Sequence, residues 1–583
     1  MNTINAKDKA KQFIENEQTF RLGALLTESS HPKTHCLSQV IQKDAQTGIR
    51  QLLSVDRDII DAQGRLFTQP GYNTLVNALH TAITTHHKVF FTGCGATGRL
   101  SILLEAAWRE FWQTLPSTDS TNTLKQSMED RCVSVMAGGD FALIKSVEGF
   151  EDFSVFGRHQ LGQAGAQAGD VVVAITEGGE TPFVIGTAWE GLEIGAQVFF
   201  VYNNPSDLLC EQVKRSREII QDPRITKLDL ATGPMAIMGS TRMQATTTEL
   251  LVVGAALEQA LARLIQNPVL APVKAISEYQ NQFTRLMNQL SDPRSVAGMA
   301  EMAQFEQGLY AQQGLITYAA QWGLLDILTD TTERSPTFMV PPFQAYGEES
   351  TAVSWGFVKN PTLSSEQSWQ AMLRREPRGL TWQAETYQQL GAPKDLQRNP
   401  PCLDNHQIHR FRIGNEPDPS RIKASAAALM IVGFQRQLPD LYASCQANLL
   451  PWFSQTALLS IGETNHCHSY DIDTRFHIPL TLPDSPLQLW RHLALKLILN
   501  TVSTATMACM GRVLGNAMVW VSPSNKKLID RGCRLIVQVT GCAYDRACHT
   551  LFKKIEELDA IGIRGNASLS PVALAIEHIL NHD

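Results

Sequence analysis

Short β-branched and aromatic runs alternate with longer helical patterns along the 583 residues of this chain. This alternation is typical of parallel sheets with helices on both faces, because parallel strands are joined by helical crossovers. We therefore expect an α/β fold built on doubly wound parallel sheets. The first half predicts the five strands of one sheet, at residues 88–93, 132–138, 170–176, 197–203 and 225–230.

The second half predicts another sheet of the same kind. Its strands are expected at residues 324–330, 411–414, 428–434, 456–462 and 476–482. The segments AITEGGETPF (174–183) and LTDTTERSPTF (328–338) share a pattern: an apolar run, then acidic and hydroxyl residues, then a Pro that we place in the first turn of a helix. The shared pattern indicates an internal duplication of one domain type.

Apolar residues at helical spacing flank and join the two predicted sheets. Residues 336 to about 405 are rich in Pro, Gln and Trp, which predicts an irregular excursion within the second sheet. We expect four units along the chain: a helical arm at 1–80, a first α/β domain with a helical connector at 81–312, a second α/β domain at 313–484, and a helical cap at 485–583.

The composition argues against several classes of protein. The formal net charge is −7 and no basic stripe is evident, so we expect no nucleic-acid binding. The N-terminus is polar from its first residue, and no apolar run is long enough to cross a bilayer of about 30 Å, so we expect no membrane association. Eleven cysteines without a regular spacing favour reduced thiols and a cytoplasmic location.

The loop GCGATGR, Gly93 to Arg99, lies between a predicted strand and an apolar helical pattern. A glycine-rich turn in this position, here with Gly95, offers backbone N–H groups and a helix N-terminus to an anion, so phosphate is the expected ligand. The loop lacks the Lys of a Walker motif, and no acidic residue closes the second strand as a ribose acceptor. A tight turn without a ligand is the alternative.

Two further loops of the first half are rich in hydroxyl groups. Thr176 directly precedes the segment EGGETP (177–182), and Thr181 lies within it. Both hydroxyls could hold phosphate or sugar, although helix capping by Thr181 explains the pattern equally well. The segment GSTRMQATTTE (239–249) has more hydroxyls than one helix cap needs. Its polar residues ahead of a long apolar helix are Ser240, Thr241 and Arg242. Loops at one edge of a sheet converge on one cleft.

Two acidic residues near the end of the second predicted strand are candidates for chemistry. Asp140 and Glu148 could accept sugar hydroxyls or act as acid and base, and the alternative is that each is a solvated residue. The segment HCH (466–468) and the group Cys542, Cys548 and His549 match no standard zinc spacing. We therefore expect neither a metal nor an organic cofactor.

Several of these motifs together resemble a known family. GCGATGR, AGGD (137–140) with VEGFED (147–152), EGGETPFVIG and GPMAIMGSTRM, in this order, resemble the sugar isomerase (SIS) domain of the N-acetylmuramic acid 6-phosphate etherases and the glucokinase regulatory protein. DTTERSPTF (330–338), SWGFVKNP (354–361) and LKLILNTVST (495–504) resemble the second SIS domain and the following helices of the regulatory protein, whereas the etherases have one SIS domain and dimerise.

The resemblance implies two SIS domains, and it favours a cytoplasmic sugar-phosphate-binding protein that acts as a metabolite sensor. The alternative is an etherase, a lyase that releases D-lactate. The domains are expected to form an internal pseudo-dimer in a monomeric chain. A phosphosugar, either a hexose phosphate or an amino-sugar phosphate, is the implied ligand. A sugar kinase is an implied partner, although no segment marks a surface that would bind it.

The resemblance also implies the residues of the phosphosugar site. Together with Gly95 and Thr181 from the loops above, they are Ala96, Thr97, Glu148, Thr176, Glu177, Gly178, Ser240, Thr241, Arg242, Glu333 and Lys496. Hydroxyls and helix amides would hold the phosphate, Lys496 would add charge, and carboxylates would hold the sugar hydroxyls.

The catalytic positions of the etherases are altered in this chain. Their catalytic glutamate falls on Ala107, and their second carboxylate falls on Asp140, a shorter acid. Glu110 lies one turn from Ala107 on roughly the same helix face and could substitute, whereas Glu105 points away. Met235 and Gln244 replace a further Glu and Lys of the etherase pattern. We therefore expect lactyl-ether cleavage to be absent or very slow, with Asp140 and Glu110 as the candidate catalytic residues.

Overall fold

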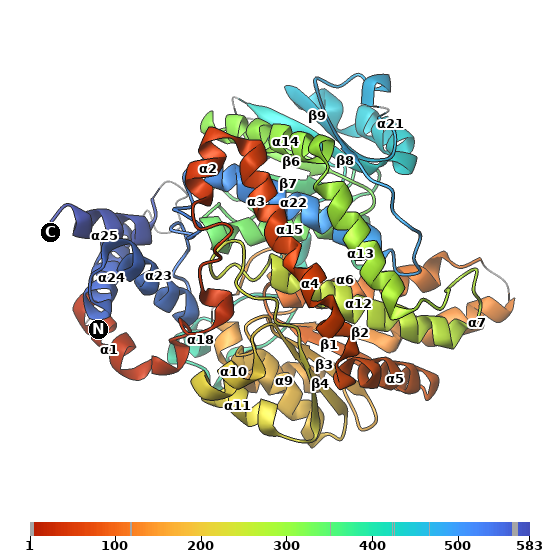
Figure 1. Ribbon diagram of the computed structural model, residues 1–583, viewed down its shortest axis with the longest axis horizontal. Helices are drawn as coiled ribbons and strands as arrows, with labels where there is room; N and C mark the ends of the chain where they lie inside the picture. Colours follow the sequence, from red (N-terminus) through yellow and green to blue (C-terminus); the bar gives the residue numbers. More distant parts are fainter. Residues whose placement is uncertain are drawn as a thin grey trace.

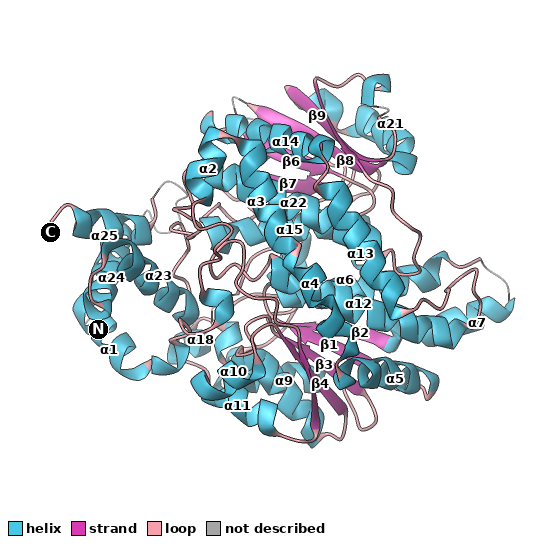
Figure 2. Cartoon of the chain, in the orientation of Figure 1, coloured by secondary structure: helices cyan, strands magenta, loops and turns pink. Residues whose placement is uncertain are grey.

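The protein contains two parallel five-stranded sheets, one in the lower and one in the upper half of Figure 1, with helices between and around them. The computed structural model describes residues 5–116, 119–147, 149–349, 351–422, 424, 426–465, 467–561 and 569–582. Figure 2 shows that helices cover both faces of each sheet. The predicted α/β class with doubly wound parallel sheets is confirmed.

The first sheet contains all five strands that the sequence predicts for it. They are β1 (Val89–Gly93), β2 (Cys132–Met136), β3 (Val171–Ile175), β4 (Gln197–Tyr202) and β5 (Ile225–Asp229), in the order β2-β1-β3-β4-β5. The helices around it are α6 (Ala96–Thr114), α7 (Asp119–Met128), α8 (Ser154–Gln163), α9 (Pro182–Glu193), α10 (Ser206–Gln212), α11 (Lys214–Gln221) and α12 (Gln244–Ile265). The strand order reverses between β1 and β3, which is where ligands bind in open α/β sheets.

The second sheet has the same topology as the first. Its strands are β6 (Leu315–Ala319), β7 (Gly356–Lys359), β8 (Ala427–Phe434), β9 (Gln455–Gly462) and β10 (Thr474–Pro479), in the order β10-β9-β8-β6-β7. Read from β7 to β10, the second sheet has its second strand at the edge, followed by its first, third, fourth and fifth strands. The first sheet, read from β2 to β5, has the same order. An identical strand order in both halves supports the internal duplication.

Two predicted strands of the second sheet are wrong. Residues 324–330 belong to helix α15 (Leu324–Phe338), and residues 411–414 lie outside any strand. Short apolar runs do not distinguish a strand from a buried helix, and here Gly323, with a φ of 74°, reverses the chain just before the run. Pro336 lies in the last turn of α15, not in a first turn, so the segment at 328–338 is not equivalent to the loop at 174–183.

Both sheets pack one face against a single central core. This core contains side chains from both sheets: Phe91 and Val173 from the first sheet, and Ile316 and Met430 from the second. The helices α6, α12, α15 and α22 (Leu489–Cys509) contribute the layer between the sheets, which Figure 1 shows in the middle of the molecule. A core shared in this way holds the two domains together.

Helices of the arm, the connector and the cap surround this core. They are α1 (Ala6–Asn16), α2 (Leu37–Lys43), α3 (Ala45–Asp56), α4 (Asp58–Thr68), α5 (Pro70–Thr84), α13 (Ile276–Leu290), α14 (Pro293–Ala311), α22 (Leu489–Cys509), α23 (Lys526–Thr540), α24 (Tyr544–Ala560) and α25 (Pro571–Leu580). The two ends of the chain meet, because Phe13 of α1 packs on Phe552 of α24 at 5.9 Å between ring centroids. Of the helices in the described ranges, none combines the length and apolarity that a membrane span requires.

The excursion at 336–405 is more ordered than predicted, and part of it packs on the first domain. It contains β7 and three short helices, α16 (Ser365–Leu373), α17 (Ala384–Gln389) and α18 (Lys394–Arg398), and it is followed by α19 (Asn405–His409), α20 (Pro419–Ile422) and α21 (Leu438–Asn448). Trp382 stacks on Phe150 of the first domain at 5.5 Å. Their shared cluster covers the outer face of the first sheet.

Candidate functional site

The glycine loop connects β1 to α6 as predicted. An added Cβ at Gly93 would lie 2.4 Å from the backbone of Thr97, and Gly95 has a φ of 56°, so the turn requires glycine at both places. The Thr97 hydroxyl accepts a hydrogen bond from the Cys94 amide (3.0 Å) and donates one to the Cys94 carbonyl (2.9 Å). Thr97 therefore holds the loop closed and points the first amides of α6, which begins at Ala96, toward the sheet edge.

The second loop lies beside the first, because β3 pairs with β1. Thr176 donates to the Thr181 hydroxyl (3.0 Å), just before α9 begins at Pro182. Glu177 Oε1 accepts a hydrogen bond from the Thr246 hydroxyl of α12 (2.7 Å). The Gly178 carbonyl accepts a hydrogen bond from the side-chain amide of Asn204 (3.0 Å). Two loops and the start of α12 therefore meet at the carboxyl ends of β1 and β3.

Glu177 lies in an unusual electrostatic environment. Burial raises its pKa, the hydrogen bond from Thr246 lowers it, and the negative charge of Glu333 raises it again, to a net value of about 7. Glu333 belongs to α15 of the second domain, so the two domains contribute carboxylates to the same region. A carboxyl that titrates near neutral pH can donate or accept a hydrogen bond there.

Arg99 connects the glycine loop to the second domain. Its side chain is 1% exposed and forms an ion pair with Glu333, while its Nε donates to the Thr332 hydroxyl (3.2 Å). The structure therefore brings Ala96, Thr97 and Glu333 into one neighbourhood through Arg99, which the sequence did not single out beyond its place in the motif.

Arg242 is buried in a second contact between the domains. Its Nη1 lies 3.0 Å from Asp330 Oδ1 of α15, and its carbonyl accepts a hydrogen bond from Lys496 Nζ of α22 (3.0 Å). Ser240 is buried and Thr241 is half-buried beside it. Arg242 is thus already paired with a carboxylate, and its charge is largely neutralised within the protein.

Lys496 contacts the start of α12 with several hydrogen bonds. It donates to the Arg242 and Met243 carbonyls and to the Thr247 hydroxyl, which lies 2.8 Å away. Burial lowers the pKa of Lys496 to about 8, although the nearby Asp56 opposes that shift. The negative charge of Glu177 also acts on Lys496, which places the lysine in the same region as the second loop.

Asp140 lies in a different environment, held by arginines of the excursion. Its two carboxylate oxygens contact Arg375 at 2.5 and 3.2 Å, and Oδ2 accepts a hydrogen bond from the Arg378 amide (2.6 Å). Glu105, fully buried, lies 2.9 Å from Arg378 Nη2. Burial raises the pKa of Glu105, but Arg375, Arg378 and Arg109 outweigh it and lower the pKa to about 2.

Glu110 is held by the same segment, because its carboxylate forms an ion pair with Arg374. Ala107 lies one turn earlier on α6, with 8% of its surface exposed. Both candidate catalytic carboxylates, Asp140 and Glu110, are therefore paired with arginines from residues 374–378. The third acidic candidate, Glu148, lies outside the described residues.

The cap contributes charges near the second loop that the sequence did not predict. Lys527 of α23 forms an ion pair with Glu180 at 2.9 Å, and its charge also lowers the pKa of Glu177. Asn525 donates a hydrogen bond to Glu151, which follows the second strand. The polar segment SPSNKK (522–527) contains both residues, but in the sequence alone it predicts only a turn, because its contacts with Glu180 and Glu151 depend on the fold.

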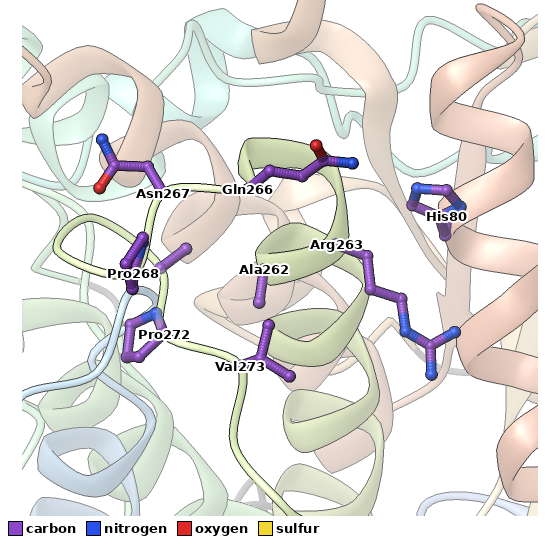
Figure 3. A pocket seen from close by; sticks show the side chains of 9 residues that line it. His80, Ala262, Arg263, Gln266, Asn267, Pro268, Pro272 and Val273 are labelled. Atoms are coloured by element: carbon purple, nitrogen blue, oxygen red, sulfur yellow. The ribbon is translucent and has the colours of Figure 1, made fainter.

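A cavity of about 530 Å³ lies elsewhere, at the C-terminal end of α12. Figure 3 shows Arg263 and His80 on one side and Asn267 and Val273 on the other. Because α12 has 22 residues and rises about 1.5 Å per residue, this cavity is about 30 Å from the loops described above. It is therefore separate from the candidate site.

Comparisons with known proteins agree with these motifs. Residues 73–189 match the family model of the glucokinase regulatory protein N-terminal SIS domain. The N-acetylmuramic acid 6-phosphate etherase of Synechococcus sp. (strain CC9902) is 28% identical over 286 residues, which are 48% of this chain and 81% of the relative. That of Prochlorococcus marinus (strain MIT 9303) is 30% identical over 242 residues, 42% of this chain and 67% of the relative.

The putative tagatose-6-phosphate ketose/aldose isomerase of Clostridium novyi NT superposes with a TM-score of 0.42 at 7% identity, covering 81% of this chain and 88% of the other.

Proposed function

The chain belongs to the SIS-domain family of the N-acetylmuramic acid 6-phosphate etherases and the glucokinase regulatory protein, and we propose that it binds a phosphosugar at the carboxyl ends of β1 and β3. The phosphate would lie against the N-terminus of α6, whose amides have no intrahelical partner, and near the Lys496 ammonium. Glu177 and Glu333, from different domains, would receive the sugar hydroxyls.

We further propose that the protein is a sensor that binds its ligand without cleaving it. The observation that carries this proposal is that both candidate catalytic carboxylates form ion pairs with one segment, Asp140 with Arg375 and Glu110 with Arg374. Ether elimination needs one group to remove a proton and another to protonate the leaving oxygen. Carboxylates that are already paired with arginines are poorly suited to either task.

The second candidate function is that of an etherase, and the relatives with that name favour it. In that case Asp140 and Glu110 would have to leave their arginine partners when the substrate binds. We further propose a cytoplasmic location, which the cysteine pattern and the resemblance favour, and a sugar kinase as partner, which rests on the resemblance alone.

Calorimetric titration tests the binding site. We expect the chain to bind a hexose 6-phosphate or N-acetylmuramic acid 6-phosphate, and Thr97→Val to weaken that binding by about 1 to 3 kcal/mol, because the valine cannot hold the Cys94 amide and carbonyl. Thr84→Val, on the exposed side of α5, is the matched control and should leave the affinity unchanged. If Thr97→Val binds as tightly as the native chain, the glycine loop is not the phosphate site.

Release of D-lactate from N-acetylmuramic acid 6-phosphate distinguishes the sensor from the lyase. Each missing acid or base group typically costs about 10² to 10⁴ in rate, so we expect the native chain to show no turnover above background. Turnover near 1 s⁻¹ or faster, which is about the low end for enzymes, would refute the sensor proposal. Ala107→Glu restores the carboxylate at the etherase position and shows whether the surrounding site still supports elimination.

A further inference from the structure

A cavity of about 40 Å³ lies between the two domains, where the loop after β6 meets α6 and the beginning of α22. Its apolar walls include Leu103 and Ala107 of α6 and Leu325 of α15. Its polar groups are Glu110, Asp326, Arg374, Gln321 and His492. The volume is about three times the minimum that holds one water molecule, and much smaller than a pocket for a hexose phosphate.

His492 lines this cavity with one nitrogen unused. The residue is 6% exposed, and its Nδ1 lies 3.0 and 3.1 Å from the two carboxylate oxygens of Asp326. Its Nε2 has no hydrogen-bond partner among the described residues. The Trp322 ring packs on the imidazole at 4.8 Å and fixes its plane. A buried polar atom without a partner costs free energy, so a ligand atom in the cavity would relieve that cost.

The N-terminus of α15 borders the same cavity. Gly323, in a left-handed conformation, precedes the helix, and no side chain caps its first turn. The first amides of a helix have no intrahelical partner and, with the helix dipole, favour an anion. The cavity therefore presents two independent sets of donors, the amides from residue 324 onward and the imidazole of His492.

The cavity occupies the place in the second domain that the phosphosugar site occupies in the first. In each domain a glycine with positive φ, Gly95 or Gly323, lies between the first strand and the following helix. In each, the equivalent helix of the other domain faces that loop: α15 brings Glu333 to the first loop, and α6 brings Glu110 to the second. The two arrangements are related by the internal duplication.

We propose that this cavity is a second ligand site, which binds a small oxyanion between His492 Nε2 and the N-terminus of α15. The oxyanion accepts a hydrogen bond from Nε2–H while Asp326 holds Nδ1–H. Burial lowers the pKa of His492, but Asp326 and Glu110 raise it above its ordinary value against the opposing charge of Arg491, which favours the donating imidazolium. The pairing of Glu110 with Arg374 reduces the repulsion of the anion.

The test follows His492 directly by NMR of the full chain carrying ¹³C-labelled histidine, with inorganic phosphate as the probe. His492→Asn assigns the resonance by its absence, and it keeps an amide near the Nδ1 position while removing Nε2. We expect the His492 resonance to shift and saturate with phosphate up to about 10 mM, ten times a millimolar dissociation constant. The resonance of His406, exposed on α19, is the internal control and is assigned with His406→Asn.

Thr97→Val separates this site from the phosphosugar site, because it alters only the first domain's loop. The same shift of His492 in that variant supports a separate site, whether or not hexose phosphates bind to the first domain. Loss of the shift in Thr97→Val would mean that the effect is transmitted from the first site and would overturn the inference. A His492 resonance that does not move with phosphate in the native chain would overturn it as well, without bearing on the phosphosugar proposal.

Discussion

Replacement of Arg375 by methionine removes the main partner of Asp140 while keeping most of the side-chain volume. Asp140 is 3% exposed, and after the change the Arg378 amide, at 2.6 Å, is the one hydrogen-bond donor among the described residues that its carboxylate keeps. A unit charge pair at 4 Å gains about 4 kcal/mol at an effective dielectric constant of about 20. Removal of one partner from a buried pair typically costs about 3 to 5 kcal/mol, because a charge remains unpaired.

We expect Arg375→Met to lower the free energy of unfolding by about 3 kcal/mol, the lower end of that range, since the Arg378 amide remains. Asp140→Asn alone should cost about 1 to 2 kcal/mol, because Arg375 keeps its ion pair with Glu105. The double variant should cost less than the sum of the two, with a coupling energy of about 2 kcal/mol. Urea-induced unfolding followed by tryptophan fluorescence measures all three values.

Arg410→Met is the matched control, because Arg410 is 41% exposed in its pair with Glu348 at 3.5 Å. Exposed pairs contribute at most about 1 kcal/mol. If Arg375→Met destabilises the protein no more than Arg410→Met does, or if the coupling between positions 375 and 140 is below about 0.5 kcal/mol, the segment does not hold Asp140 in the way described.

Three further predictions concern the site and the assembly. Because the pKa of Glu177 is raised to about 7, the native chain should lose about 3 kcal/mol of stability as the pH rises from about 4.5 to about 7, and Glu177→Gln should remove that loss in parallel unfolding curves. Lys496→Met should weaken phosphosugar binding by about 1.5 to 3 kcal/mol in calorimetry, whereas Lys11→Met, exposed on α1, should not. Sedimentation equilibrium should give the mass of one chain, 64.5 kDa, because the second domain already covers the interface of the first; a dimer that pairs the first domains would contradict this.

The sequence was sufficient for the first sheet and not for the second, where β6 and β7 were missed and a strand was predicted over part of α15. Strands such as Val171–Ile175 are buried on both faces and bounded by polar turns, so they stand out as short apolar runs. The run at 324–330 is also rich in leucine and isoleucine, but it carries two aspartates, and its leucines contribute to the central core from a helix. The strand Gly356–Lys359 has only four residues and lacks such a signal.

The local motifs of the candidate site were predictable, whereas the contacts that control its charge were not. The turn at Gly95 and the cap at Thr181 depend on neighbouring residues, and their spacing is visible in the sequence. Arg375 lies 235 residues from Asp140, and no periodicity or motif relates the two positions. Pairing of this kind depends on where the excursion returns to the first domain, which only the three-dimensional fold determines.

That long separation also matters while the chain is being made. The first domain, with Asp140 and Glu105, leaves the ribosome well before residues 374–378 exist. At about 5 to 20 residues per second, Asp140 waits on the order of ten to fifty seconds for Arg375, which follows 235 residues later. During that interval its carboxylate has no arginine from this segment and must stay hydrated, so the first domain cannot close over it. Final packing around Asp140 therefore cannot precede the synthesis of residues 374–378, even though β2, which ends just before Asp140, is among the first strands to emerge.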